Sequence, residues 1–261
     1  MSTKRIKIHR IDLDQGAIAE KEDVAALDEA VCIFVNGEYY RTLIATPTMV
    51  EELVVGHLMG EGIIGSLDDL REVDVKPLKV TVELGKDVDL NVLNMSKVDL
   101  ITTACGSLST PIHEDQLGSM RTASNIKVEA EKIWSMVREL NLRSEVFRET
   151  GGTHSAMLCS PDGEILSFAE DVGRHNAVDK VIGAGLLRGI ELGECVLVSS
   201  GRQSSEIVLK VARSGIPVIA SVAGPLKSGI GVADATGITL ICFVRGRRMN
   251  VYTHRERILT A

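Results

Sequence analysis

Seven consecutive residues bring together most of the side-chain chemistry that a small binding site needs. They are Glu170–Asp171–Val172–Gly173–Arg174–His175–Asn176, which offer carboxylates, a guanidinium, an imidazole and an amide. Ile165–Phe168 before them has the pattern of a short strand, and Ala177–Leu187 after them has apolar residues at helical spacing. A strand-to-helix turn of an α/β unit lies where such folds bind ligands, and the helix N-terminus attracts anions. This turn is therefore predicted to form a site.

Three other turns follow strands of the C-terminal half and carry basic residues and glycines. They are Ser199–Ser204, Ala223–Gly229 and Arg245–Asn250. The carboxyl ends of parallel strands meet at one edge of a sheet, so all four turns are predicted to converge there. Arginine binds phosphate through paired hydrogen bonds, and glycine lets backbone N–H groups approach its oxygens. We expect a phosphate-containing ligand, contacted by Arg202, Lys227, Arg245, Arg247 and Arg248 with Gly201 and Gly246. The alternative for any single arginine is a solvated surface position.

Two histidines belong to these polar segments. His154 begins a strand after the Gly151–Gly152 pair, and His175 lies in the turn described first. Each could move a proton near neutral pH or hydrogen-bond a base, and each could instead be a structural histidine. Asp171 likewise has two interpretations, as a ligand contact or as the N-terminal cap of the helix that follows.

The five cysteines differ in their surroundings. Cys32, Cys195 and Cys242 lie in apolar strands and are predicted to be core residues, whereas Cys159 ends a strand and is ambiguous. Cys105 alone lies in a small, polar segment, Thr102–Ser109, where a large partner could reach its thiolate. An exposed cysteine without a role is the alternative. No Cys-x-x-Cys pair is present, so a disulfide framework and a structural zinc site are both disfavoured.

Composition indicates an ordinary globular protein. The 261 residues are 44% hydrophobic but only 3% aromatic, which favours a core of Val, Ile, Leu and Ala. The net charge of -7 argues against a broad nucleic-acid-binding surface. No apolar run approaches the about 18 residues of a membrane span, and no apolar segment follows the basic start as in a secretory signal. We therefore expect no membrane partner and a cytoplasmic location.

The first half predicts a smaller α+β part. Residues 1–30 are polar and irregular, with one edge strand expected at Ile6–Ile8. Asn36–Gly37 between two β-like runs predicts a hairpin over Val31–Ile44. Thr48 and Glu51 have capping-box spacing at the start of a helix that should end near the glycines at 60 and 62. Strands are expected near Leu78–Leu84 and Val98–Ile101, followed by a long loop over residues 102–125.

The second half predicts alternating strands and helices, and thus a largely parallel sheet. A helix over Val128–Leu140 comes first. The strands are expected at His154–Leu158, Ile165–Phe168, Cys195–Ser199, Pro217–Val222 and Ile238–Val244, and the helices at Ala177–Ile190, Ser205–Ser214 and Val232–Thr236. We divide the chain into residues 1–125, which end in the Cys105 loop, and residues 126–261, an α/β domain that binds a cofactor.

Several of these segments resemble one known family. The segments are Glu170–Lys180, Thr150–His154, Ser200–Ile207, Phe243–Arg245 with Met249–Tyr252, and, in the first half, Thr46–Pro47, Gly56–Leu58 and Glu61–Ile64. Together they resemble the FdhD/NarQ family, the formate dehydrogenase accessory sulfurtransferases. The resemblance implies a cytidine-deaminase-like three-layer α/β domain with a smaller N-terminal α+β part, commonly as a homodimer.

The resemblance also implies a role. The family accepts persulfide sulfur from a cysteine desulfurase and passes it to the molybdenum (or tungsten) bis-pterin guanine dinucleotide cofactor, which then enters apo-formate dehydrogenase. The family's persulfide-bearing cysteine corresponds to Cys105. No metal ligands of the protein's own are implied. The family's cofactor-binding segment corresponds to Phe243, Val244, Arg245, Gly246, Arg247 and Arg248. We expect the rest of the pocket to be built by His154, Asp171, Arg174, His175, Asn176, Ser200, Gly201 and Arg202.

One departure from the family pattern keeps an alternative open. The family loop usually reads Cys-Gly-x-Cys-Gly, whereas this chain has Leu108 and Ser109 at the last two positions. A relay between two thiols is impossible here, although a single persulfide on Cys105 is feasible. A chaperone that binds the same cofactor without transferring sulfur is therefore the second hypothesis. A zinc nucleoside deaminase is the third, but the sequence lacks its ligand set and glutamate spacing.

Overall fold

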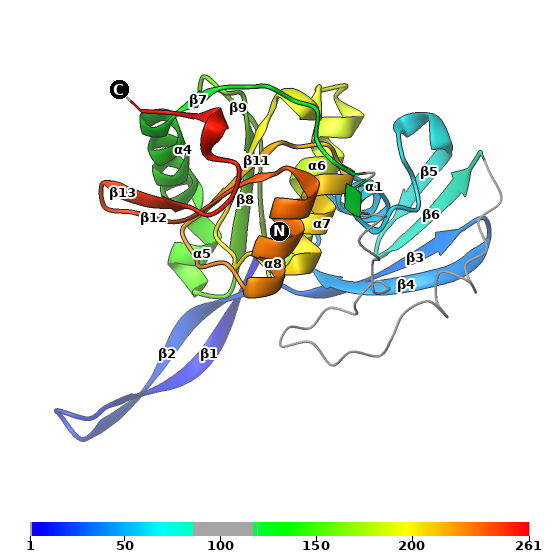
Figure 1. Ribbon diagram of the computed structural model, residues 1–261. Coiled ribbons are helices and arrows are strands. Elements are labelled where there is room, and N and C mark those ends of the chain that lie inside the picture. The colour runs from blue at the N-terminus through cyan, green and yellow to red at the C-terminus, as the bar shows by residue number, and fades with distance from the viewer. Residues whose placement is uncertain (1, 86–116, 119, 261) are drawn as a thin grey trace.

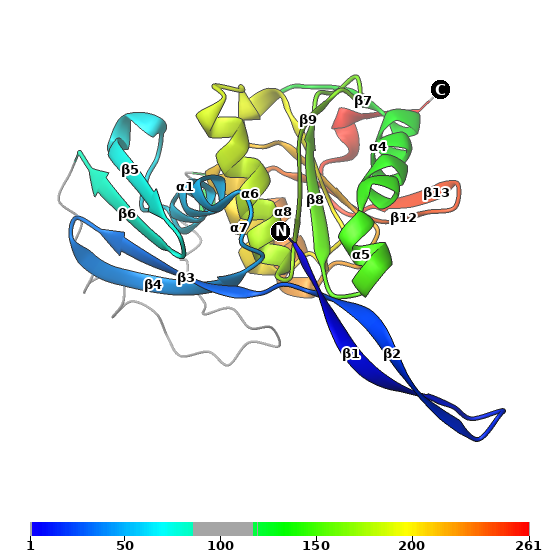
Figure 2. The ribbon, with the colours of Figure 1, turned by 180° about the vertical axis from the view of Figure 1, so that it is seen from behind.

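The computed structural model describes residues 2–85, 117–118 and 120–260 (Figure 1). The architecture is mixed α/β, as predicted, while the likeness to cytidine deaminases stays a prediction. A six-stranded sheet and a four-stranded sheet hold most of the strands. Figures 1 and 2 show the two sheets on opposite sides of a central group of helices. The predicted strand at Val98–Ile101 and the Cys105 loop lie outside the described residues.

The six-stranded sheet has the order β13-β12-β11-β10-β8-β9. The prediction of a largely parallel sheet is wrong, because only the pairs β10–β11 and β11–β12 are parallel. β8 and β9 are joined by a connection too short for a crossover, and β12 and β13 by a tight hairpin, so both pairs are antiparallel. The strands are β8 (His154–Cys159), β9 (Ile165–Asp171), β10 (Val196–Ser199), β11 (Val218–Ser221), β12 (Thr239–Arg245) and β13 (Arg248–Val251).

The predicted convergence of turns survives this correction. β8 is antiparallel to both of its neighbours, so β9 and β10 run in the same direction. β11 and β12 are parallel to β10, and therefore β9, β10, β11 and β12 all end at one edge of the sheet. The same argument places the first residue of β8, His154, at that edge.

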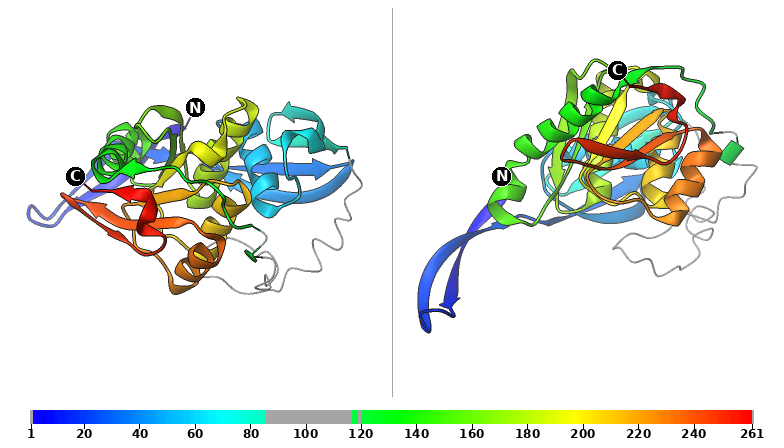
Figure 3. Two further views of the ribbon diagram at one scale, coloured as in Figure 1. Left: turned by 45° about the horizontal axis from the view of Figure 1, so that its top comes forward. Right: turned by 60° about the vertical axis from the view of Figure 1, so that its left-hand side comes forward.

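Helices cover both faces of this sheet (Figure 3). One face carries α6 (Arg174–Leu187) and α7 (Ser205–Arg213), close to their predicted positions, and α8 (Lys227–Thr236). α8 begins five residues before the predicted Val232, so Lys227, predicted to contact a ligand from a turn, is the first residue of a helix instead. The other face carries α4 (Ala130–Arg143) and the short α5 (Glu145–Thr150); Val128–Glu129, expected in the helix, forms the strand β7 instead and pairs with β14 (Ile258–Leu259). The 3₁₀ turns are η1 (Leu67–Asp69), η2 (Leu192–Glu194) and η3 (Arg255–Arg257). Among the described residues, no helix has the length and apolarity to cross a membrane.

Alternate residues of the central strands face the two helical layers. Leu197 and Ile219 belong to the apolar cluster under α6 and α7, whereas Val196, Val198 and Val218 belong to the cluster under α4. Both sets are fully buried, which explains the continuous apolar runs in the sequence.

The four-stranded sheet has the order β4-β3-β6-β5. Its β3 (Glu29–Val35) and β4 (Glu38–Ala45) form the predicted hairpin, and β6 (Lys79–Leu84) confirms the predicted strand, whereas β5 (Leu70–Lys76) was not expected. Asn36 and Gly37 both have positive φ, 48° and 81°, as a two-residue hairpin turn of this type requires.

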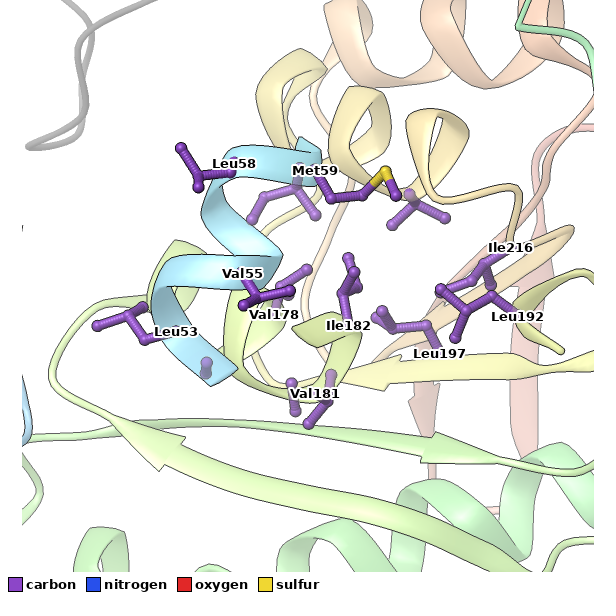
Figure 4. Close-up of a cluster of buried hydrophobic side chains, with 14 of the residues drawn as sticks. Leu53, Val55, Leu58, Met59, Val178, Val181, Ile182, Leu192, Leu197 and Ile216 are labelled. Carbon is purple, nitrogen blue, oxygen red and sulfur yellow. The ribbon is translucent and has the colours of Figure 1, made fainter. Parts of the chain in front are cut away.

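The helix α1 (Val50–Glu61) lies between this sheet and α6 (Figures 1 and 2). It ends at Gly62, φ 73°, as predicted, but the predicted capping box is wrong. The helix begins after Met49, and no side chain caps it, because the backbone N–H of Thr48 bonds instead to the Thr46 carbonyl at 2.7 Å. Figure 4 shows the apolar side chains of α1 packed against those of α6.

The first strands form a ribbon that the sequence did not reveal. β1 (Thr3–Asp12) and β2 (Ala17–Ala26) pair antiparallel and project from the body (Figure 2). The prediction of an irregular segment with a single edge strand is therefore wrong. Both faces of the ribbon are largely exposed and carry cross-strand ion pairs such as Lys7–Glu20, so the usual apolar alternation of a half-buried strand is missing.

Candidate functional site

The carboxyl edge of the six-stranded sheet is a continuous, hydrogen-bonded surface that we call the rim. It comprises His154, the turns 171–175, 200–204 and 223–226, and the end of β12 at residues 243–245. Backbone bonds join the turn after β10 to β8 and to the turn after β11, and join that turn to β12, which confirms that these turns converge. These bonds run from Ser200 N to Ser155 O at 2.9 Å, from Gln203 N to Gly224 O at 3.1 Å and from Phe243 N to Ala223 O at 3.1 Å.

Arg174 and Gly201 join the first two turns of the rim. The aliphatic part of Arg174 lies directly against Gly201, where an added Cβ would come within 2.9 Å of the Arg174 Cβ. The lack of a side chain at residue 201 therefore lets Arg174 lie across the turn after β10. The exposed Arg202 follows in the same turn, so the structure brings together a predicted phosphate ligand, Arg202, and a predicted residue of the cofactor pocket, Arg174.

His154 lies beside these arginines, as predicted. Its Nδ1 is 3.4 Å from the Ser200 hydroxyl, and the backbone N–H of Ser155 donates to the same hydroxyl at 2.9 Å. Burial, Arg174 and Arg202 lower the pKa of His154 below its usual value. A neutral imidazole beside two guanidinium groups can accept a hydrogen bond from a ligand.

His175 lies in the first turn of α6. Burial, with Lys210 and Arg174 nearby, lowers the pKa of its imidazole to about 4. Its Nε2 is buried and makes no hydrogen bond with the described residues. A buried nitrogen without a partner is uncommon in folded proteins, and a polar ligand would supply the missing bond.

Gln203 and Ser204 lie in the neighbouring turn of the rim, at the start of α7, and were not predicted from the sequence to be site residues. Gln203 is 0% exposed and Ser204 5% exposed, yet Gln203 Oε1 and Ser204 Oγ make no hydrogen bond with the described residues. Ser204 is the N-cap residue of α7, but its hydroxyl forms no capping bond. The N-terminus of this nine-residue helix offers free N–H groups to an anion. The signal in the sequence was a serine before an apolar helical pattern, which is ordinarily a cap.

Asp171 takes neither of its two predicted roles, a ligand contact or the N-terminal cap of the helix that follows. The carboxylate is 0% exposed and accepts from the backbone N–H of Thr46 at 3.1 Å and of Gly173 at 2.8 Å. It also forms an ion pair of 2.6 Å with Lys180, whose side chain is 0% exposed. No side chain caps α6. Asp171 thus fixes the turn to the first half of the chain, and we assign it to positioning.

Two more polar side chains of the turn serve the same purpose. Asn176 donates through Nδ2 to the Ile44 carbonyl at 2.8 Å and to Asp171 at 2.9 Å. The Glu170 carboxylate accepts from the backbone N–H groups of Val146 and Phe147 at the start of α5, at 3.0 and 2.9 Å. Of the remaining side chains of this motif, Arg174 lies against Gly201, and His175 has a buried Nε2 that makes no hydrogen bond with the described residues.

The side chains of the last predicted segment, residues 243–248, point to two sides of the sheet edge, some towards the rim and some towards α4. Phe243 has φ 54° at an irregularity of β12, and its ring lies on Gly224, where a Cβ would come within 2.7 Å of it. The guanidinium of Arg245 stacks on this ring at 4.9 Å. Phe243 and Arg245 therefore belong to the rim, while Val244 is 2% exposed in the core under α4.

Arg247 turns the other way. Its guanidinium forms a two-pronged ion pair with Glu131 of α4, at 2.6 and 2.8 Å, and lies 4.6 Å from the centre of the Trp134 ring. The indole N–H of Trp134 also donates to the Gly246 carbonyl. The structure does not bring Arg247 to Arg202 and His175, although a shallow depression runs along Arg245, Gly246, Arg247 and Arg248.

Three of the four cysteines within the described residues are poor nucleophiles, while Cys32, predicted to be a core residue, is only half-buried in β3. Cys159 is 0% exposed, which resolves its ambiguity in favour of the core. Burial raises the pKa of Cys159 and Cys242 to about 12 and that of Cys195 to about 11, so these thiols stay protonated. Cys105 lies outside the described residues. Within residues 2–85, 117–118 and 120–260, no three His, Cys, Asp or Glu side chains are grouped as metal ligands.

Comparison with known proteins gives consistent matches over nearly the whole chain. The model of the FdhD/NarQ family matches residues 26–259. A sulfur carrier protein FdhD of Wolinella succinogenes is 36% identical over 256 residues, covering 98% of this chain and 89% of the relative. Its Bacillus subtilis counterpart is 35% identical over 248 residues, 94% of each chain. A crystal structure of a candidate formate dehydrogenase accessory protein from Desulfotalea psychrophila superposes with a TM-score of 0.81 at 28% identity, covering 99% and 100% of the two chains.

Proposed function

Because the chain belongs to the FdhD/NarQ family, we propose that it is a sulfur carrier for formate dehydrogenase maturation, with a persulfide on Cys105 and a cofactor site at the rim. The relatives supply the general role through their names, sulfur carrier protein FdhD. The finer assignment concerns the sulfur donor, the sulfur acceptor and the residues that bind each of them.

The donor step is an exchange of sulfur between two cysteines. The thiolate of Cys105 attacks the outer sulfur of a persulfide on a cysteine desulfurase. A new S–S bond forms on Cys105, the S–S bond of the donor breaks, and the donor cysteine leaves as a thiolate. No net oxidation occurs, and a single thiol is sufficient, so the absence of a second cysteine at Leu108 is compatible with this step. The chain acts as a sulfurtransferase when it passes this sulfur on.

The acceptor is the molybdenum or tungsten bis-pterin guanine dinucleotide cofactor, bound here as a substrate before it enters apo-formate dehydrogenase. Arg174 and Arg202 suit its phosphates because guanidinium groups bind phosphate oxygens in pairs. The neutral His154 and the Ser200 hydroxyl suit polar groups of the nucleotide. The Phe243 ring with Arg245 above it offers a flat surface at the other end of the rim.

One observation carries the acceptor site. Arg174 lies across Gly201, beside Arg202 and His154, on a chain whose net charge is -7. Two guanidinium groups at one sheet edge create a local positive charge on an acidic chain, and this charge favours the binding of an anion. A dinucleotide pyrophosphate is an anion of suitable size and charge.

Sulfur loading tests the donor half of the proposal. The chain is incubated with a cysteine desulfurase and cysteine carrying labelled sulfur, and protein-bound persulfide is measured. Cys105→Ala should abolish labelling, while the matched variant Cys159→Ala should label like the unaltered chain because its thiol is buried and protonated. Equal labelling of the two variants would overturn the role of Cys105.

A chaperone that binds the cofactor without transferring sulfur is the second candidate, favoured by Leu108 in place of the family's second cysteine. The test is the activity of formate dehydrogenase made in cells that contain only a Cys105→Ser variant. Retained activity supports the chaperone, and lost activity supports the sulfur carrier.

A further inference from the structure

A cluster of charged side chains is buried directly behind the rim, between α1, α6 and α7. At its centre, Lys210 of α7 contacts both carboxylate oxygens of Asp179 of α6 at 2.9 Å. His57 of α1 lies 3.3 Å from Asp179, and Glu61 of α1 lies 3.5 Å from Lys210. Asp179 is 1% exposed, His57 4% and Lys210 5%. The cluster thus ties three helices together through nearly dry ionic contacts.

The neighbouring residues are arranged to accommodate this cluster. Gly60 of α1 leaves room for Lys210, because a Cβ there would come within 2.7 Å of the Lys210 Cγ. Gly56 lies against the Asp179 backbone carbonyl, which an added Cβ would strike. Burial raises the pKa of Glu61, but Lys210, His57, Arg41 and Arg213 outweigh it and lower the pKa to about 2. Glu61 is therefore ionised, whereas burial and Lys210 lower the pKa of His57 below its usual value. The glycines of α1 leave the space that the cluster occupies.

Stability alone does not explain such a cluster. Removing two charges from water opposes folding, and an apolar pair of similar volume is often as stable as a buried ion pair or more so. Here α6 and α7 already share one apolar cluster, which includes Val178 and Ile182 of α6 and Ile207 and Val211 of α7. The ionic contacts add what an apolar contact lacks, which is a fixed direction and length between specific atoms of the two helices.

The place of the pair within its helices suggests what it fixes. Asp179 lies four residues, about one turn, after His175 on α6. Lys210 lies six residues after Ser204, within two turns of the start of α7. The ion pair therefore joins α6 to α7 just below the ends that present His175, Gln203 and Ser204. Those are the residues whose buried polar atoms have no partner among the described residues.

We propose that the Lys210–Asp179 pair is a positioning device that sets the spacing between the N-termini of α6 and α7. With this spacing, His175 and Ser204 bind the phosphates of the nucleotide, and Gln203 Oε1 accepts a hydrogen bond from one of its N–H or O–H groups. This inference rests on the proposed acceptor site and deepens it. Neither Lys210 nor Asp179 touches the ligand; each acts through the helix that carries it.

Two double variants separate a positioning role from a general need for the pair. Asp179→Leu with Lys210→Met removes the charges and the directional bond but keeps the volume. Asp179→Asn with Lys210→Gln removes the charges but keeps a hydrogen bond between the helices. A third double variant, Glu139→Gln with Arg143→Gln, removes an exposed ion pair of α4 far from the site and serves as the control.

The measurements are the Tm of each variant and its affinity for GDP, used as the nucleotide probe. The apolar pair removes the cation beside Glu61 and the carboxylate beside His57, so its Tm should fall while its unfolding stays cooperative. Its GDP affinity should drop at least tenfold. The hydrogen-bonded neutral pair should stay within about threefold of the unaltered affinity, as should the α4 control.

Each outcome bears on the inference. Normal GDP affinity in the apolar pair overturns the positioning role. Equal losses in the apolar and hydrogen-bonded pairs also overturn it, since a directional contact would then not matter. Loss of cooperative unfolding in the apolar pair would show that the fold itself requires the charges, and would contradict it as well. Absence of GDP binding by the unaltered chain overturns the acceptor site, and this inference with it.

Discussion

The β9–α6 turn and the neighbouring β10–α7 turn both carry dense polar side chains, but their hydrogen bonding differs. In the first, Asp171 and Asn176 bond to backbone groups of Thr46 and Ile44 and to each other, and Asp171 also pairs with Lys180. In the second, buried oxygens of Gln203 and Ser204 have no partner among the described residues.

This difference separates residues that build the site from residues that use it. A buried polar group whose hydrogen bonds are complete holds the chain in place and has no capacity left for a ligand. A buried polar group with a missing bond is unfavourable until something supplies that bond. A densely polar motif in a sequence can therefore contain both kinds, and only the partners tell them apart.

The largest effect is expected in the β9–α6 turn, where the hydrogen bonds of Asp171 and Asn176 are complete. Lys180→Met leaves the Asp171 carboxylate buried without its cation, and the free energy of unfolding should fall by about 3–5 kcal/mol. Urea denaturation measures this loss. The control Arg202→Gln alters an exposed residue and should change stability by less than about 1 kcal/mol. A loss below about 1 kcal/mol for Lys180→Met would show that the pair does not hold the turn.

A substitution of a residue proposed to contact the ligand should weaken ligand binding and leave folding intact. Arg174→Gln removes charge-assisted hydrogen bonds worth about 1.5–3 kcal/mol, so GDP affinity should fall by about 10- to 100-fold. Isothermal titration calorimetry measures the affinity, and thermal unfolding checks that the variant is as stable as the unaltered chain. Unchanged affinity with a large loss of stability would place Arg174 among the residues that build the site.

The pH dependence of stability sharpens the comparison at His175. Its pKa in the folded chain is lowered from 6.5 to about 4, so between these values the unfolded chain binds more protons. The stability that depends on this neutral imidazole is complete above about pH 6.5 and is lost as the pH falls toward 4. His175→Gln should flatten this decline by up to about 3 kcal/mol, measured by urea denaturation at several pH values. Identical pH profiles would show that His175 is not buried as described.

The smallest effect is expected on the outer side of the β12–β13 hairpin. Glu131→Gln breaks the ion pair with Arg247, whose two side chains are 67% and 57% exposed. The expected loss of stability is under about 1 kcal/mol, with GDP affinity within about threefold of the unaltered chain. Arg245→Gln on the rim side is the comparison variant and should weaken GDP binding more. A larger effect of Glu131→Gln on binding would show that Arg247 belongs to the ligand site after all.

Local patterns in the sequence were sufficient for much of the fold. The Asn36–Gly37 turn, the apolar runs of β10, β11 and β12 and the C-terminal glycine of α1 each act over a few residues, so their signals are readable without a structure. The convergence of the turns on one edge followed from the order of strands and helices. The β1–β2 ribbon was not predicted, because it buries neither face and its sequence therefore has no apolar alternation.

The tertiary structure decided which polar residues build the site and which are left for a ligand. Asp171 accepts a hydrogen bond from the backbone of Thr46, which is 125 residues away in the sequence. Arg247 donates to Glu131, which is 116 residues away. Such partners leave no periodicity and no local spacing in the sequence, because they meet only after the sheets and helices have packed. The sequence by itself determined which turns carry the polar side chains of the site. Long-range hydrogen bonds, which only the tertiary structure shows, determined which of those side chains hold the turns in place.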